Sequence, residues 1–145
     1  MEYRWWRGRD RYGVGVTSWI EVINFVRVRY EVLEETDDWL RFRLGTEGER
    51  TQQVSVHHLP DLDGQAWVEI SSPVGRVDEV DLLRFLELAG APELGGAAVV
   101  DGLALLKHVA PLEDLSIREE FERPLALLVA RADTLEHELT SSDHF

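Results

Sequence analysis

Three short runs in which apolar and polar residues alternate, each followed by turn-forming residues or a proline, constrain the fold of this chain most strongly. The runs are "WLRFRL" (39–44), "RTQQVSVHHL" (50–59) and "AWVEIS" (66–71), with the turn sequences "GTEGE" and "DLDGQ" between them. Alternation with a period of two predicts strands with one buried face, and such short connections favour an antiparallel meander. The residues predicted to face inward are Leu40, Phe42, Leu44, Val54, Val56, Ala66, Val68 and Ile70.

A helix is expected before this meander, from about residue 18 to residue 35. Ser18 and Glu21 have the spacing of a capping box, and an apolar stripe follows them. The stripe consists of Trp19, Ile23, Val26, Tyr30 and Leu33. A strand is the alternative, because Val26, Val28, Tyr30 and Val32 also alternate. The good cap and the absence of a turn residue favour the helix.

A second helix and a hairpin are predicted after the meander. Asp78 is placed to cap a helix through "EVDLLRFLELA" (79–89), which Gly90 ends. The segment "GGAAVVDGLALLKHVAP" (95–111) reads as a hairpin, with Asp101-Gly102 suited to a type I′ turn. The stripe of the helix consists of Leu82, Phe85, Leu86 and Ala89.

The last element is predicted to be one long amphipathic helix. Ser116 and Glu119 form a second capping box, and Pro124 is expected to kink the helix because it removes a donor and crowds the preceding turn. The apolar stripe consists of Ile117, Phe121, Leu125, Leu128, Ala132, Leu135 and Leu139.

The predicted order is therefore helix, three strands, helix, two strands, helix. Strands with one apolar face and helices with one apolar stripe indicate an α+β domain, with an antiparallel sheet partly covered by helices. We expect a single domain over residues 17–140, an irregular arm over residues 1–16 and a frayed tail over residues 141–145.

This order resembles the class I type III secretion chaperone fold, and four segments point to its YbjN-like branch, whose members are called sensory transduction regulators. The segments lie between about residues 39 and 139, and the arm is outside them. They are "TQQVSVHHL", "AWVEISSPVG" with "VDEVDLLRFLELAG", "GGAAVVDGLALLKHVAPLEDL" and "FERPLALLVARADTLEHEL". The resemblance implies small homodimers or heterodimers that bind protein segments through apolar surface, and it implies no enzymatic activity.

The net charge of −13 is unevenly distributed along the chain. Residues 1–30 carry six arginines against three acids, whereas residues 31–145 carry nine basic residues against 25 acids. So acidic a body repels phosphate backbones at long range, which argues against nucleic acid as the main ligand. The chain has no cysteine, no apolar run near the ~20 residues that span a bilayer, and no signal-peptide pattern. We expect a cytoplasmic protein with no membrane partner.

Adjacent histidines, His57 and His58, are the strongest candidates for chemistry. Successive residues of a strand point to opposite faces, so these two imidazoles could not easily share one ion. Metal-binding pairs have spacing i, i+2 on strands or i, i+4 on helices. We therefore expect no metal and no cofactor, with one imidazole at the sheet edge and the other partly packed. His108 and His137 are expected at the surface.

The arm sequence "YRWWRGRDRY" interleaves arginines with aromatic residues. Arg4, Trp5, Trp6 and Arg7 could contact the acidic body of the same chain or of a second subunit. The alternative is an arm that stacks nucleic-acid bases or binds another anionic surface. The charge of the body favours docking on the body.

The preferred function is a non-catalytic protein-binding module, chaperone-like or regulatory, that acts as a homodimer or as a heterodimer with a related subunit. The candidate dimer or partner face is the second helix, with Leu82, Leu83, Phe85 and Leu86. Leu82 and Leu83 point in different directions around a helix, so a stripe facing the sheet leaves apolar residues that need cover. The alternatives are an enzyme or metal protein using His57 or His58 with nearby acids, and an arm-mediated binder of nucleic acid or anionic surfaces.

Overall fold

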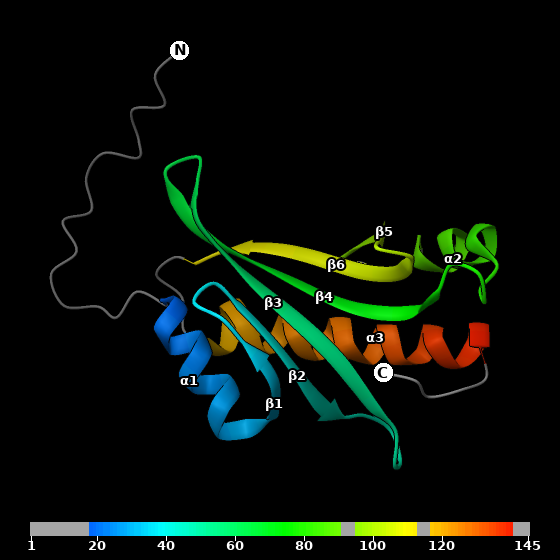
Figure 1. Cartoon of the computed structure of the whole chain (residues 1–145), viewed down its shortest axis with the longest axis horizontal. Coiled ribbons are helices and arrows are strands. Elements are labelled where there is room, and N and C mark those ends of the chain that lie inside the picture. Colours follow the sequence, from blue (N-terminus) through cyan, green and yellow to red (C-terminus); the bar gives the residue numbers. More distant parts are fainter. Residues whose placement is uncertain (1–17, 91–94, 113–116, 141–145) are drawn as a thin grey trace, which may run out of the picture.

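A six-stranded antiparallel sheet and three α-helices form the protein in this computed structural model, which describes residues 18–90, 95–112 and 117–140 (Figure 1). The elements in chain order are α1 (Trp19–Arg29), β1 (Glu31–Glu35), β2 (Trp39–Gly45), β3 (Thr51–Leu62), β4 (Gln65–Arg76), α2 (Leu82–Ala89), β5 (Gly96–Val100), β6 (Leu103–Pro111), the π-helical turn η2 (Arg118–Glu122) and α3 (Arg123–Thr140). The predicted α+β class with an antiparallel sheet is confirmed. The order contains one additional strand, β1, in place of the end of the preferred first helix.

The strands lie in the order β1-β2-β3-β4-β6-β5, so the three predicted meander strands are neighbours in the centre of the sheet. The longest pair is the β3–β4 hairpin, which extends well beyond the rest of the sheet in Figure 1. Its turn is at Asp63 and Gly64, both with positive φ. Asp101 and Gly102 also have positive φ, as the predicted type I′ turn between β5 and β6 requires.

The prediction that the first helix continues to residue 35 is wrong. Ser18 caps α1 as expected, because its side chain accepts a hydrogen bond from the Glu21 N–H. However, Tyr30 ends the helix in an extended conformation, and its ring stacks on Phe42 of β2 at 5.3 Å between centroids. Burial of this aromatic pair favours the strand alternative for the residues that follow, which form β1.

The second helix begins later than predicted, at Leu82 rather than residue 79. Asp81 is its N-cap, since its carboxylate accepts a hydrogen bond from the Arg84 N–H at 3.1 Å. Asp78 instead pairs with the Arg76 guanidinium, with 3.1 Å between Nε and Oδ1. The predicted end at Gly90 is confirmed.

The last helix contains a π-helical turn immediately before Pro124. The Arg123 N–H donates to the Arg118 carbonyl, five residues earlier. Pro124 has no N–H to donate, so the disturbance expected from it takes the form of a widened turn. Ser116, the predicted cap, lies outside the described residues. The predicted stripe is confirmed: Phe121, Leu125, Leu128, Ala132 and Leu135 are fully buried.

The helices α1 and α3 pack against one face of the sheet, and a single hydrophobic core joins them to it. Phe25 of α1 contacts Phe121 edge to face at 5.7 Å between centroids, and both rings meet the inward residues of the strands. The opposite face carries partly exposed polar residues with cross-strand ion pairs. These pairs are Arg41–Glu34 at 3.3 Å, Arg43–Glu31 at 3.6 Å and Lys107–Glu69 at 3.2 Å.

The two edges of the sheet have different chemistry. The edge strand β1 carries Glu31, Glu34 and Glu35, and its pairing with β2 is irregular between Val32 and Glu34. Charges and bulges of this kind discourage pairing with another strand. The other edge strand, β5, has the sequence "GAAVV", with no charge, no proline and no bulge.

Candidate functional site

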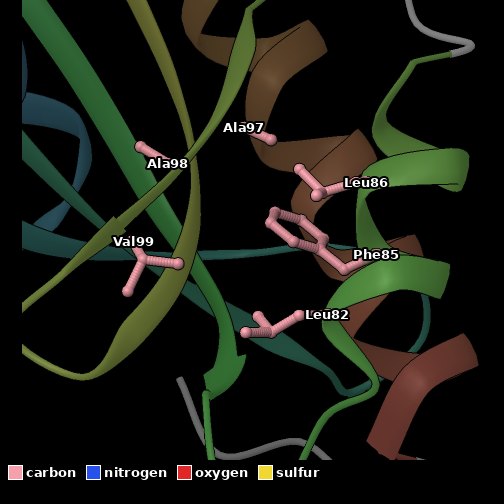
Figure 2. A pocket seen from close by; sticks show the side chains of 6 residues that line it. All are labelled: Leu82, Phe85, Leu86, Ala97, Ala98 and Val99. Atoms are coloured by element: carbon pink, nitrogen blue, oxygen red, sulfur yellow. The ribbon is translucent and has the colours of Figure 1, made fainter.

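An apolar groove lies between the helix α2 and the edge strand β5. Figure 2 shows Leu82, Phe85 and Leu86 pointing from α2 toward β5. The six residues that line this α2–β5 groove are Leu82, Phe85, Leu86, Ala97, Ala98 and Val99. Its volume is about 200 Å³. Small-molecule sites usually measure roughly 300–1,000 Å³, so the size of the groove suits one or two amino-acid side chains better than a cofactor.

The helix α2 exposes three of the four residues predicted for a dimer or partner face. Leu83 is 67% exposed, Leu86 is 56% exposed and Leu82 is 38% exposed. Phe85 is only 1% exposed, so it belongs to the core and forms the floor of the groove rather than a free surface. Ala89, one turn later, is also buried. The helix therefore uses Phe85 and Ala89 for its own domain and leaves its leucines uncovered.

Two valines of β5 are exposed, and one of them continues this apolar surface. Val99 is 53% exposed and Val100 is 45% exposed. Because Val99 pairs with Ala104 and Val100 with Leu103, their side chains lie on opposite faces of the strand. Only Val99 lines the groove. The sequence predicts a hairpin for this segment but does not indicate that its first strand lies at an edge of the sheet.

Gly95 fixes the start of β5 against the body. Its φ is +86°, and a Cβ there would lie 2.8 Å from Leu128 Cδ1 and 3.1 Å from the Lys107 carbonyl oxygen. Only glycine tolerates both the conformation and this close approach. The β5 wall of the groove is therefore held in place by a backbone contact that a larger residue would disturb.

Two aspartates are close in the chain to the residues at one end of the groove. The Val77 N–H donates to the Gly102 carbonyl at 2.9 Å, which brings the segment before α2 next to the β5–β6 turn. Asp81 and Asp101, both exposed, follow directly from the two walls at this end. Within residues 18–90, 95–112 and 117–140, neither carboxylate forms an ion pair. Asp78 and Glu79 lie on the same segment but are paired with Arg76.

The adjacent histidines point to opposite faces of β3, as their spacing predicted. His57 is exposed beside Trp39 and Glu69, its neighbours on β2 and β4. It is therefore on an open face of a central strand, not at the sheet edge as expected. His58 packs on the other face, stacked on Trp19 with 5.1 Å between ring centroids. Among the described residues, no group of three or more His, Asp or Glu side chains is placed to hold a metal ion.

Burial lowers the pKa of two histidines. Desolvation lowers the pKa of His58, and the Asp38 carboxylate opposes this effect. Desolvation also lowers the pKa of His108. His108 pairs with the buried Ile70 and is half-buried, so the expectation that it lies at the surface is wrong. His137 of α3 is exposed as expected.

The core also contains polar side chains that the sequence analysis missed. Gln52, fully buried, donates through Nε2 to Ser72 Oγ at 2.9 Å and to the Pro73 carbonyl at 2.6 Å. Ser72 Oγ in turn donates to the Gln53 carbonyl at 2.6 Å. Gln52 stands at an inward position of the alternating pattern, which was the only signal for its burial. These bonds fix the register of β3 on β4.

The predicted arm contacts, Arg4, Trp5, Trp6 and Arg7, lie outside the described residues, as do the proposed tail residues 141–145. No helix within the described part of the chain is long and apolar enough to cross a membrane. No family model matches the sequence, and no curated protein matches it either. The fold class and the α2–β5 groove are therefore the basis for a functional proposal.

Proposed function

We propose that this protein is a non-catalytic protein-binding module, chaperone-like or regulatory, that acts in the cytoplasm as a dimer and binds protein segments through apolar surface. The observation that carries the proposal is the exposure of Leu82, Leu83 and Leu86 on α2 beside Val99 of β5. Adjacent exposed leucines and valines on a domain with its own complete core are typical of a contact surface. The resemblance of the sequence to the YbjN-like branch of the chaperone fold favours the same function.

Leu83 is the proposed centre of the dimer contact. Its side chain is 67% exposed and does not line the groove, so a second subunit can cover it without filling the groove. The second subunit is either an identical chain or a related one. For an identical chain, Arg84 and Glu87 of the same helix provide opposite charges that can pair across a two-fold axis.

Sedimentation at several protein concentrations tests this proposal with a closely matched pair of variants. Leu83 and Ile20 are both the second residue of a helix, and they are 67% and 68% exposed. A glutamate favours the first turn of either helix, so neither Leu83→Glu nor Ile20→Glu should weaken its helix. We expect Leu83→Glu to weaken dimerisation about tenfold or more, since burying a leucine contributes roughly 1.5–3 kcal/mol. Ile20→Glu should leave the dimer intact.

A wild-type protein that stays monomeric at high concentration, or equal effects of the two variants, would contradict the proposed dimer face. If the natural subunit is a related chain, the same pair of variants should be compared for binding to that chain in a co-expression experiment.

A further inference from the structure

We infer that the α2–β5 groove binds an extended segment of a partner protein, which pairs with β5 as an additional strand and has basic residues at the end next to Asp81 and Asp101. This inference rests on the proposed function and specifies the ligand class that the binding module takes. It concerns the groove itself and not the dimer contact at Leu83.

The hydrogen-bonding edge of β5 is the first support. Among the described residues, β5 pairs with β6 alone. In an antiparallel pair, alternate residues direct their N–H and C=O groups away from the partner strand. The free edge of β5 therefore presents a row of donors and acceptors, and the strand lacks the charges that protect β1.

The position of α2 beside this edge is the second support. A groove between an edge strand and a helix allows an extended peptide to pair with the strand while its side chains contact the helix. Here the contacts on the helix are Leu82 and Leu86, and the contacts on the strand are Ala97 and Val99. The volume of about 200 Å³ accommodates small or branched apolar side chains at alternate positions of the segment.

Charge selects the occupant. Asp81 and Asp101 are exposed at one end of the groove without ion-pair partners in the described part of the chain. The lining of the groove is uncharged, and the whole chain carries a net charge of −13. A segment with lysine or arginine beside an apolar run complements both the uncharged lining and the acidic end of the groove.

A synthetic peptide tests the inference directly. The probe is Lys-Lys-Val-Thr-Val-Thr-Val-Lys-Lys with a fluorescent label, titrated with the full chain and measured by anisotropy at low and physiological salt. Hydrogen exchange of the complex reports on the β5 amides. We expect binding that weakens with salt, and increased protection of alternate β5 amides on binding.

Matched variants locate the site. Val99→Gln removes a groove contact, and Val100→Gln makes the same change on the opposite face of the same strand. We expect Val99→Gln to weaken the affinity for the peptide about tenfold and Val100→Gln to change this affinity less than about twofold. Asp101→Asn removes the charge while keeping a residue that tolerates positive φ. It should weaken binding of the peptide with lysines at its ends, but not binding of a variant peptide with serines at its ends.

Several results would overturn the inference. One is equal binding of a peptide with prolines at alternate positions, because prolines cannot donate to β5. Another is equal binding by the Val99→Gln and Val100→Gln proteins. Binding that appears only in Leu83→Glu would assign the groove to a second copy, and binding that appears only after deletion of residues 1–17 would assign it to the arm. If Leu83→Glu abolishes the dimer but the protein still binds the peptide, the groove and the dimer contact are separate surfaces. That result supports the inference.

Discussion

Arg50, in the turn before β3, forms a two-pronged ion pair with Asp133 of α3, with 2.8 Å between Nη2 and Oδ2 and 3.1 Å between Nε and Oδ2. The Asp133 side chain is 4% exposed, whereas that of Arg50 is 28% exposed. Arg50→Met should therefore leave a buried carboxylate without its main partner and lower the free energy of unfolding by about 3 kcal/mol. Chemical denaturation measures this loss.

The double variant Arg50→Met/Asp133→Leu is the control for this ion pair. Removing both charges should restore most of the lost stability, because an apolar pair does not require the compensation that a lone charge does. A loss below about 0.5 kcal/mol in Arg50→Met, the size expected for a surface ion pair, would show that the contact contributes little.

Stability should decrease as the pH falls through about 6.5, the usual pKa of histidine. Burial lowers the pKa of both His58 and His108 in the folded state, so the unfolded chain binds protons first. The loss begins near the unfolded pKa and levels off below the folded values. Thermal unfolding between pH 5 and pH 8 measures it. The double variant His58→Phe/His108→Leu should flatten this part of the profile, and an unchanged slope would exclude these two groups as its source.

Gly95→Ala should destabilise the protein by about 2 kcal/mol, since it places a Cβ against Leu128 and the Lys107 carbonyl at a positive φ. Gly96→Ala is the control, because a Cβ there meets no atom within 4 Å. We expect a change of less than about 0.5 kcal/mol for the control. Circular dichroism during denaturation compares the two. Equal effects would indicate that β5 can shift freely relative to α3.

Zinc should not stabilise the protein through His57 and His58, because their imidazoles lie on opposite faces of β3. We expect that protein purified without an affinity tag contains no stoichiometric metal, and that a chelator leaves the melting temperature unchanged. A bound metal that is lost in both His57→Gln and His58→Gln would contradict this prediction and revive the metal-protein alternative.

The periodic parts of the fold were predictable from the sequence, and the positions set by tertiary contacts were not. The alternation of β2, β3 and β4 and the stripe of α3 each depend on burial of one face, which the pattern records directly. The end of α1 was not predictable, because Tyr30 fits both a helical stripe and an alternating strand. Tyr30 stacks on Phe42 only after β2 has folded back beside it, and this tertiary contact favours the strand.

The candidate site was predicted in part. The leucines of α2 could be recognised because they occupy more of the helix surface than one buried stripe requires. The groove could not be recognised, since it depends on β5 lying at an edge, and strand order is not encoded in local alternation. Asp81 rather than Asp78 caps α2 because Asp78 is held by Arg76, a competition between two nearby acids that spacing alone does not resolve.

The unequal edges of the sheet limit how large an assembly can become. A filament requires two adhesive ends on every unit, so that each addition creates a new place for the next. One edge of the sheet is β1 with its glutamates, and the other is the uncharged "GAAVV" strand β5. A chain that pairs through β5 therefore leaves only its charged β1 edge free. Edge-to-edge pairing of two β5 strands would therefore leave only acidic β1 edges exposed, and these discourage the addition of a further chain through the sheet.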